Sequence, residues 1–310
     1  MNNYNHKSED IIDLKVLFFM LWNKKISIAT ITSIFAILSI FYSLSLPNIY
    51  QSSATLIPTT SNKSLSGSLS SFSSIANIAG IQVPNGEASK AQEAIKRINS
   101  LEFFSKYFLP EIKLQNLMAI SQWLPEENLI LYDSSIFDVK NDKWVVEDGN
   151  PNKKNPSNQE AFLAYKESLS ISEDIKSSFV TITMKHKSPF ISKKWVDLII
   201  KKINSSMRTE DEKVALNSIT FLNEYSKSIN IQSLRSTISK LQESQMQILM
   251  IASSSDSYIF KTLDSAVVPE IKLGPKRSLI CILGTLLGFM ISTLSILILN
   301  YFKNPNKNIS

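Results

Sequence analysis

The sequence predicts an α+β protein held in a membrane by two transmembrane helices, which flank a large domain carrying a very long extended helix. Three observations predict this fold. Two stretches without a charged residue, 26–46 and 278–302, are long enough to cross the hydrocarbon core of a bilayer. The segment between them, 47–277, is long enough to bury a core of its own. Within it, residues 190–268 contain neither glycine nor proline and repeat apolar side chains at helical spacing.

The first apolar stretch, 26–46, is predicted to stay in the protein as an anchor. The apolar core of a cleaved signal peptide spans about 7–15 residues and precedes a small-residue cleavage site. This stretch is longer and continues into LPNIYQ, which offers no such site. A buried core helix is the other alternative, but core helices of soluble proteins keep a polar face.

The short tails predict the orientation in the membrane. Tail 1–25 carries four lysines against three acidic residues, and tail 303–310 carries two lysines and no acid. Positive charge in short segments favours the cytoplasmic side, so we expect both tails there and 47–277 on the far side. Lys272, Lys276 and Arg277, just outside the second span, argue the other way, but long translocated domains largely escape this rule.

Composition excludes several kinds of function. The formal net charge of +6 is spread over the chain without the basic patch of a nucleic-acid-binding protein. The single cysteine, Cys281, lies inside the second span, so no disulfide is expected in the outer domain. There is no phosphate-binding glycine motif, no metal-ligand spacing around the two histidines and no nucleophile motif. We therefore expect no catalytic residue, cofactor or metal.

The domain reads as strands and helices in a definite order. Residues 49–57 and 258–268 are extended in character, and we expect these two strands to pair at the base of the domain. Residues 59–74 are serine-rich and predict a loop, and so does 148–158 inside a region of short elements, 111–158. The remaining expected elements are helices at 87–109 and 161–168 and strands at 169–171 and 179–184.

The long helix is predicted to need a partner outside its own domain. Its apolar positions alternate gaps of four and three residues, at Leu234, Ile238, Leu241, Gln245, Ile248 and Ala252. An earlier stripe, at Leu222, Tyr225 and Ile229, is out of phase with it, which suggests a stutter near Ile231. A single helix of about 45–60 residues would reach about 70–90 Å. We expect Leu234, Ile238, Leu241 and Ile248 to pack against other copies of the chain.

Two further features lie at the second span. Gly284 and Gly288 are four residues apart on one helical face, which lets another helix backbone approach closely, either the first span or a neighbouring copy. Pro269 and Pro275 bracket a short connector into the span. Lys276 and Arg277 follow it, where they anchor the helix end by reaching the lipid headgroups, or bind a lipid phosphate.

Three segments resemble one known family. They are YQSSATLIP at 50–58, KSPFISKKWVDLIIKKIN at 187–204 and, most specific, YIFKTLDSAVVPEIKLGPKRSLICILGTLLG at 258–288. With the two-span layout, they make the chain similar to the Wzz polysaccharide co-polymerases over nearly its whole length, least between about 111 and 158. Gly274 departs from the family in a connector that is often richer in proline, which puts the stiffness of that connector in doubt.

The resemblance implies a non-catalytic regulator of chain length. Such proteins form a ring of identical subunits, usually taken as octameric, in the bacterial inner membrane, with an α/β base near the membrane and long helices rising into the periplasm. The family sets the modal number of repeat units that a Wzy-type polymerase adds to an undecaprenyl-linked polysaccharide. Because 303–310 has no kinase motif, the lipopolysaccharide O-antigen type fits best, or its relative for enterobacterial common antigen.

Other classes stay open as alternatives. A two-span periplasmic sensor needs an output module after its second span, and eight residues do not hold one. A transport adaptor with a long helical hairpin is normally anchored once. An enzyme of glycan assembly would need an acid–base or nucleophile arrangement, which the sequence does not show.

Overall fold

A computed structural model describes residues 21–59, 90–145, 155–228 and 232–303. Its contacts group the chain into two units. One comprises residues 48–273, and the other comprises the two terminal segments, up to residue 47 and from residue 274. Most of the loop expected at 59–74, most of that at 148–158 and both chain ends lie outside the described residues.

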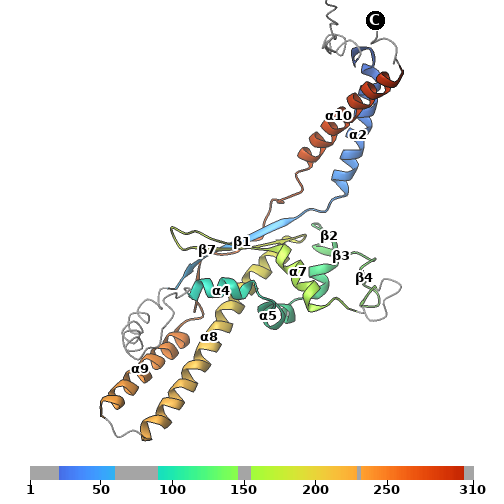
Figure 1. Ribbon diagram of the computed structural model, residues 1–310. Coiled ribbons are helices and arrows are strands. Elements are labelled where there is room, and N and C mark those ends of the chain that lie inside the picture. Colours follow the sequence, from blue (N-terminus) through green and yellow to red (C-terminus); the bar gives the residue numbers. More distant parts are fainter. Residues whose placement is uncertain (1–20, 60–89, 146–154, 229–231, 304–310) are drawn as a thin grey trace, which may run out of the picture. The chain divides into compact units, whose positions relative to one another are not determined.

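The terminal unit is a pair of apolar helices that pack along each other (Figure 1). Helix α2 spans Lys25–Ser45 and helix α10 spans Arg277–Lys303. Both are long and apolar enough to cross a membrane. Large apolar side chains stay exposed along both, among them Ile34, Leu38, Leu283 and Leu287, as expected of helices whose outer faces contact lipid. The two predicted spans are therefore confirmed.

The other unit is built on a four-stranded antiparallel sheet. Its strands are β6 (Leu169–Glu173), β7 (Val180–His186), β1 (Tyr50–Pro58) and β8 (Phe260–Asp264), in that order across the sheet. Strand β1 pairs with β7 on one side, Ala54 opposite Ile182, and with β8 on the other, Leu56 opposite Thr262. The predicted pairing of the strand after the first span with the strand before the second is confirmed.

A helix on one face of the sheet closes the core. Helix α8 (Pro189–Ser228) starts directly after β7, and its first half packs on β1 and β7. Its apolar positions at helical spacing, Trp195, Ile199 and Ile203, are buried there. An aromatic group made by Phe104, Phe108 and Tyr165 completes the core, with ring centroids about 5–6 Å apart.

The helix predicted at 87–109 is wrong as a single element. Helix α4 spans Lys90–Ile98, and the chain restarts after Ser100 as α5 (Leu101–Phe103), a π-helical turn (Phe104–Phe108) and a 3₁₀ turn (Leu109–Glu111). Ser100 has extended backbone angles, and its hydroxyl accepts a hydrogen bond from the amide of Phe103 at 3.2 Å. A serine that caps a new helix in this way ends the previous one. Residues 87–89 lie outside the described part of the chain.

The region of short elements comes next. It contains α6 (Leu114–Met118), the hairpin β2 (Ile120–Leu124) and β3 (Leu129–Tyr132), and the pair β4 (Phe137–Asp138) and β5 (Lys143–Trp144). Helix α7 (Asn158–Ser168) begins three residues before its predicted start. A capping box explains the earlier start, because Ser157 and Glu160 each bond to the other's backbone amide.

The long helix predicted after Pro189 is a helical hairpin. Helix α8 has 40 residues, and α9 (Gln232–Ser254) has 23 and returns alongside it (Figure 1). A single helix of 45–60 residues is therefore wrong. Leu222 and Tyr225 of the earlier stripe lie on α8, and Leu234 to Ala252 of the later one lie on α9. Residues 229–231 lie outside the described residues. Both arms have buried apolar side chains, Ala215 on α8 and Ile238 and Ala252 on α9.

Candidate functional site

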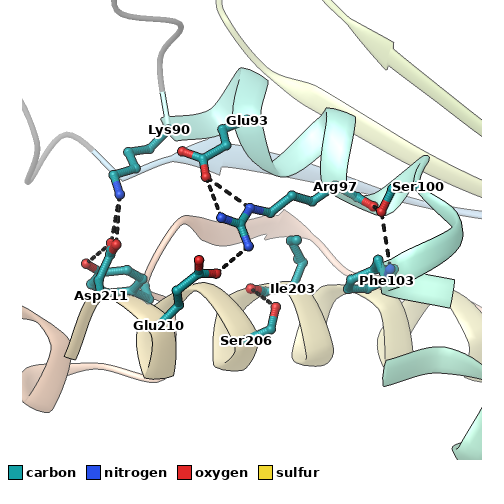
Figure 2. Close-up of polar contacts among 10 residues, drawn as sticks. Lys90, Glu93, Arg97, Ser100, Phe103, Ile203, Ser206, Glu210 and Asp211 are labelled. Carbon is teal, nitrogen blue, oxygen red and sulfur yellow. Dashed lines mark hydrogen bonds and ion pairs between the residues drawn. The ribbon is translucent and has the colours of Figure 1, made fainter. Parts of the chain in front are cut away.

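Helix α4 lies across α8 where α8 leaves the core, and charged side chains join the two. Ala91, Ala94 and Ile98 form the buried face of α4. Lys90 and Arg97 are seven residues apart, so they project from the same side of the helix. Lys90 Nζ lies 2.9 Å from both carboxylate oxygens of Asp211, and Arg97 binds Glu210. Figure 2 shows these side chains of α4 pointing toward α8.

Asp211 also binds a third segment. The Tyr258 hydroxyl, from the chain between α9 and β8, donates a hydrogen bond to Asp211 Oδ2 at 2.6 Å. Burial, followed by this bond, raises the pKa of Tyr258, so the hydroxyl stays protonated and remains a donor. One carboxylate thus connects α4, α8 and the chain that follows α9. We call this chain, residues 255–264, the return segment. We call Lys90, Arg97, Glu210, Asp211 and Tyr258 the hairpin-base network.

The second ion pair of the network also stays charged. The hydrogen bond that Arg97 donates to Glu210 raises the pKa of Arg97, and the same bond lowers the pKa of Glu210. Within α4, Glu93 Oε1 accepts from Arg97 Nη2 at 2.8 Å, which orients the guanidinium toward α8. These side chains are between a third and a half exposed, so each pair adds little to stability and acts mainly by fixing geometry.

Asn204 anchors the return segment to α8 from inside the core. Its side-chain Oδ1 accepts from the amides of Ile259 and Phe260 at 2.8 and 2.9 Å, and its Nδ2 donates to the carbonyl of Phe260 at 3.0 Å. The residue is 5% exposed. A buried amide with these three bonds holds the start of β8 at one place on α8.

A hollow of about 430 Å³ opens beside Asn204, between α8 and β8. Asp197, Lys201 and Arg208 line it from α8, and Asp256 and Thr262 line it from the return segment. Its charges are partly paired, because Arg208 Nη1 lies 3.0 Å from Asp256 Oδ1. This ion pair is a further polar link between α8 and the return segment.

His186 holds the junction of β7 and α8. Its Nδ1 accepts from the amide of Ser188 at 2.9 Å, which places the ring proton on Nε2, 2.8 Å from the carbonyl of Asn116. The imidazole ring packs edge-on against the ring of Trp195, with 4.7 Å between the ring centroids. Burial lowers the pKa of His186, because the charged form would lose its hydration. This histidine is a structural link between two elements.

Gly284 and Gly288 face the first membrane helix. A Cβ atom at Gly284 would overlap Ser39, and one at Gly288 would overlap Phe35. The absence of side chains at both positions is therefore what allows α10 to lie close to α2. Of the two partners left open by the sequence, the structure places the first span against the glycine face.

The connector residues fall on both sides of the boundary between the units. In the domain, Leu273 donates its amide to the carbonyl of Ile49 at 2.8 Å, and Ser52 Oγ donates to the carbonyl of Val267 at 2.7 Å. The stretch that contains Pro269 thus runs beside the start of β1. In the terminal unit, Pro275, Lys276 and Arg277 lead into α10, whose first amides bond to the carbonyl of Lys276.

The four residues predicted to pack between copies do not share one environment. Leu234 is 45% exposed, Ile238 is buried inside the hairpin, and Leu241 and Ile248 are half-buried. Other apolar side chains of the hairpin are more exposed: Val214, Leu216, Phe221, Met246 and Met250. Sequence analysis missed these residues, although Met246 and Met250 repeat at helical spacing.

Sequence analysis also missed the hairpin-base network. The pair formed by Glu93 and Arg97 is visible in the sequence as a four-residue spacing. The bonds to Glu210, Asp211 and Tyr258 join positions that are 47 to 121 residues apart, for which a single sequence gives no signal.

Within the described residues, no group of three or more His, Cys, Asp or Glu side chains is placed to hold a metal ion. The hairpin-base network consists of ion pairs and hydrogen bonds that are mutually satisfied, with no nucleophile beside a base. What this arrangement can do is hold helices in a fixed relation.

Comparison with known proteins gives a family match at the N-terminal third of the chain. Residues 10–109 match the family model for Wzz, described as chain length determinant protein. No curated protein matches the sequence. One similar solved structure is titled full-length bacterial polysaccharide co-polymerase, with 15% identity, a TM-score of 0.41, and coverage of 96% of this chain and 100% of that one.

A second similar structure is a fragment of WzzB, polysaccharide co-polymerase, from Salmonella Typhimurium. It has 9% identity and a TM-score of 0.27, and the match covers 73% of this chain and 100% of that one. Likenesses of this size carry no argument about function. The family match runs through α2, β1 and α4, which are the first membrane helix, the central strand and the helix of the network. This part of the chain, residues 10–109, is therefore similar to the Wzz family of chain length determinant proteins.

Proposed function

We propose that this protein sets the modal number of repeat units that a Wzy-type polymerase adds to an undecaprenyl-linked polysaccharide, in lipopolysaccharide O-antigen biosynthesis. As a chain length determinant it is non-catalytic and acts from the bacterial inner membrane, with its domain in the periplasm. The glycan class comes from the sequence resemblance stated above, and the contact with the polymerase is part of the proposal.

One observation carries the proposal. The family match covers α2 and β1, and β1 pairs directly with β8, the last strand before the connector into α10. The two membrane helices therefore bracket a domain whose first and last strands are hydrogen-bonded neighbours. A domain closed in this way, with a tall hairpin, suits a scaffold better than an enzyme.

We further propose that identical subunits assemble into a ring. Exposed apolar side chains along the hairpin, including Leu234, Phe221 and Met250, support this, because burial against a neighbouring copy would remove them from water. Leu241 and Ile248, half-buried in one chain, would complete such a contact. Ile238 would contribute indirectly, by holding α9 against α8.

The experiment that tests the function is a glycan profile. Deleting the gene should replace the modal cluster of O-antigen bands on a gel with a distribution that decays steadily with length, and the full chain supplied in trans should restore the cluster. An unchanged ladder after deletion would disprove the proposal. A surface polysaccharide other than O-antigen that loses its modal length would correct the glycan class alone.

The glycine face of α10 offers a second test. Replacing both Gly284 and Gly288 with leucine forces α10 away from Ser39 and Phe35, so we expect the modal length to change. Ser278→Leu is the control, because it places a leucine at an exposed position of the same helix. An unaltered ladder in the double variant, at a normal protein level, would show that this close packing is not needed.

Assembly of the subunits into a ring can be tested at Leu234, the exposed one of the four residues predicted to pack between copies. Leu234→Asp places a charge where the neighbouring copy would pack, and should shift the detergent-purified protein toward smaller assemblies in size-exclusion chromatography. Ser239→Asp, also exposed on α9, is the control. An assembly of full size in the Leu234 variant would contradict this part of the proposal.

A further inference from the structure

We propose that Asp211 is a positioning residue, which fixes the direction of the hairpin relative to the sheet and, through that direction, the chain length. This inference rests on the proposed function. It assigns a role to residues of this chain that belong neither to its membrane helices nor to the predicted packing stripe.

Asp211 is placed to control direction because it joins three segments at one point. Its two carboxylate oxygens accept from Lys90 on α4, and Oδ2 also accepts from Tyr258 on the return segment. The side chain of Asp211 is 21% exposed, and Tyr258 is 7% exposed. Bonds to a charged group in such partly buried surroundings are stronger and more directional than bonds between surface side chains.

A second attachment turns the contact into a fixed angle. Arg97, two helical turns along α4 from Lys90, binds Glu210, the residue before Asp211. The buried face of α4 holds it in the core, and two bonds separated by two helical turns restrict its orientation on α8 further. Because β1, β7 and the core hold the first half of α8, these bonds relate the emerging hairpin to the base.

Small changes at this point have large effects farther along. Helix α8 continues from Asp211 to Ser228, 17 residues, and a helix of that length extends about 25 Å. A tilt of about 10° at Asp211 would move its end by about 4 Å. Val214, in the next turn after Asp211, is already 56% exposed, so the hairpin is leaving its own core there. Any partner that packs on the hairpin would detect the tilt.

The test removes the two partners of Asp211 separately. Lys90→Met deletes the charge and keeps the aliphatic stem, and Tyr258→Phe deletes the hydroxyl and keeps the ring. Both variants leave the core intact, so they should reach normal levels in the membrane. Lys96→Met, an exposed lysine on the same helix, is the matched control.

Two readouts are measured on the full chain. The first is the O-antigen ladder, in which we expect the modal cluster to broaden for either variant, and to be lost in Lys90→Met/Tyr258→Phe. The second is a spin-label distance between exposed Ser170 on β6 and exposed Lys240 on α9, in Cys281→Ser protein diluted with unlabelled subunits. We expect a wider distance distribution in the double variant and an unchanged one in Lys96→Met.

A third variant tests whether Lys90 and Tyr258 act through Asp211. Adding Asp211→Asn to the double variant should change neither readout, because the two partners that Asp211 has among the described residues are already gone. A further change would overturn the assignment of Asp211 as the hub, and so would a narrow, unshifted distance distribution in the double variant. If distances broaden while the ladder stays normal, the link from hairpin direction to chain length is wrong, whereas loss of the modal cluster on gene deletion would still support the proposed function.

Discussion

The base of the domain and the outer part of its hairpin use apolar side chains in opposite ways. In the base, Leu56, Phe104 and Ile182 are completely buried by the chain itself. Along the hairpin, Phe221 is 63% exposed and Met250 is 66% exposed, although both belong to regular helices. The base is therefore complete in one chain. The hairpin continues from the base through α8, is also joined to it by polar bonds, and leaves an apolar surface available to neighbours.

A phenylalanine in each region tests this difference, and the base should show the largest effect in the molecule. Phe104 lies 5.0–6.0 Å from the rings of Tyr165, Phe162 and Phe108, so Phe104→Ala removes these contacts and leaves a cavity. We expect a loss of about 4 kcal/mol in the free energy of unfolding. Phe221→Ala should cost less than about 0.5 kcal/mol in the dissociated chain.

Denaturant unfolding in detergent measures both variants. Phe221 stacks on Tyr225 of its own helix, with 5.9 Å between the ring centroids, and is 63% exposed. Its truncation therefore removes little packing from the separate chain. Comparable losses in the two variants would show that the hairpin has a core of its own. A larger loss for Phe221→Ala in the assembled protein would instead locate a contact between copies.

The next largest effect is expected at the polar anchor of the return segment. Asn204→Leu keeps the size of the side chain but leaves the amides of Ile259 and Phe260 and the carbonyl of Phe260 without their present partner. Unsatisfied buried groups predict a loss of about 3 kcal/mol. Ser205→Ala, one position along α8, is the control. Equal stability of Asn204→Leu and the unmodified chain would mean that water replaces these bonds.

How far the sequence could predict this molecule differs between the two regions. Uncharged length is a local property, and so is strand alternation, so both spans and the strands at 49–57 and 179–184 were predicted correctly. The hairpin was predicted as one long helix because residues 190–268 contain no glycine or proline. Their absence does not exclude a reversal of the chain, and only the change of phase near Ile231 indicated one. Ser100 similarly divides a segment whose apolar spacing is continuous.

The hairpin-base network was beyond prediction for a different reason. Lys90 and Asp211 are ordinary surface-type residues in the sequence, and they acquire a role only because the fold packs α4 against α8. Residue type identifies chemistry when the chemistry is rare, as in a metal site. An ion pair that sets an angle uses common residues and can be recognised only from coordinates.

A smaller effect in the base should depend on pH. Burial, and to a smaller extent the charge of Lys187, lowers the native pKa of His186 below its usual 6.5. Between the two pKa values the unfolded chain binds more protons than the native chain, so stability falls as pH falls below about 6.5. The slope should be at most about 1.4 kcal/mol per pH unit. His186→Gln should remove this part of the slope, measured as the apparent unfolding free energy between pH 7.5 and 5. An identical pH dependence in the variant would assign the slope to other groups.

The smallest effect should come from the link between the arms of the hairpin. Gln242 Nε2 on α9 donates to Asn223 Oδ1 on α8 at 2.7 Å, and Asn223 is exposed, so water can replace the bond when it is lost. Asn223→Ala should therefore lower the free energy of unfolding by less than about 0.5 kcal/mol, a small fraction of the Asn204 effect, although both residues are asparagines on the same helix. Denaturant unfolding of the two variants side by side measures the contrast. A loss at Asn223 as large as that at Asn204 would mean that the outer hairpin is locked by its own polar bonds, and the division between a self-sufficient base and a partner-dependent hairpin would fail.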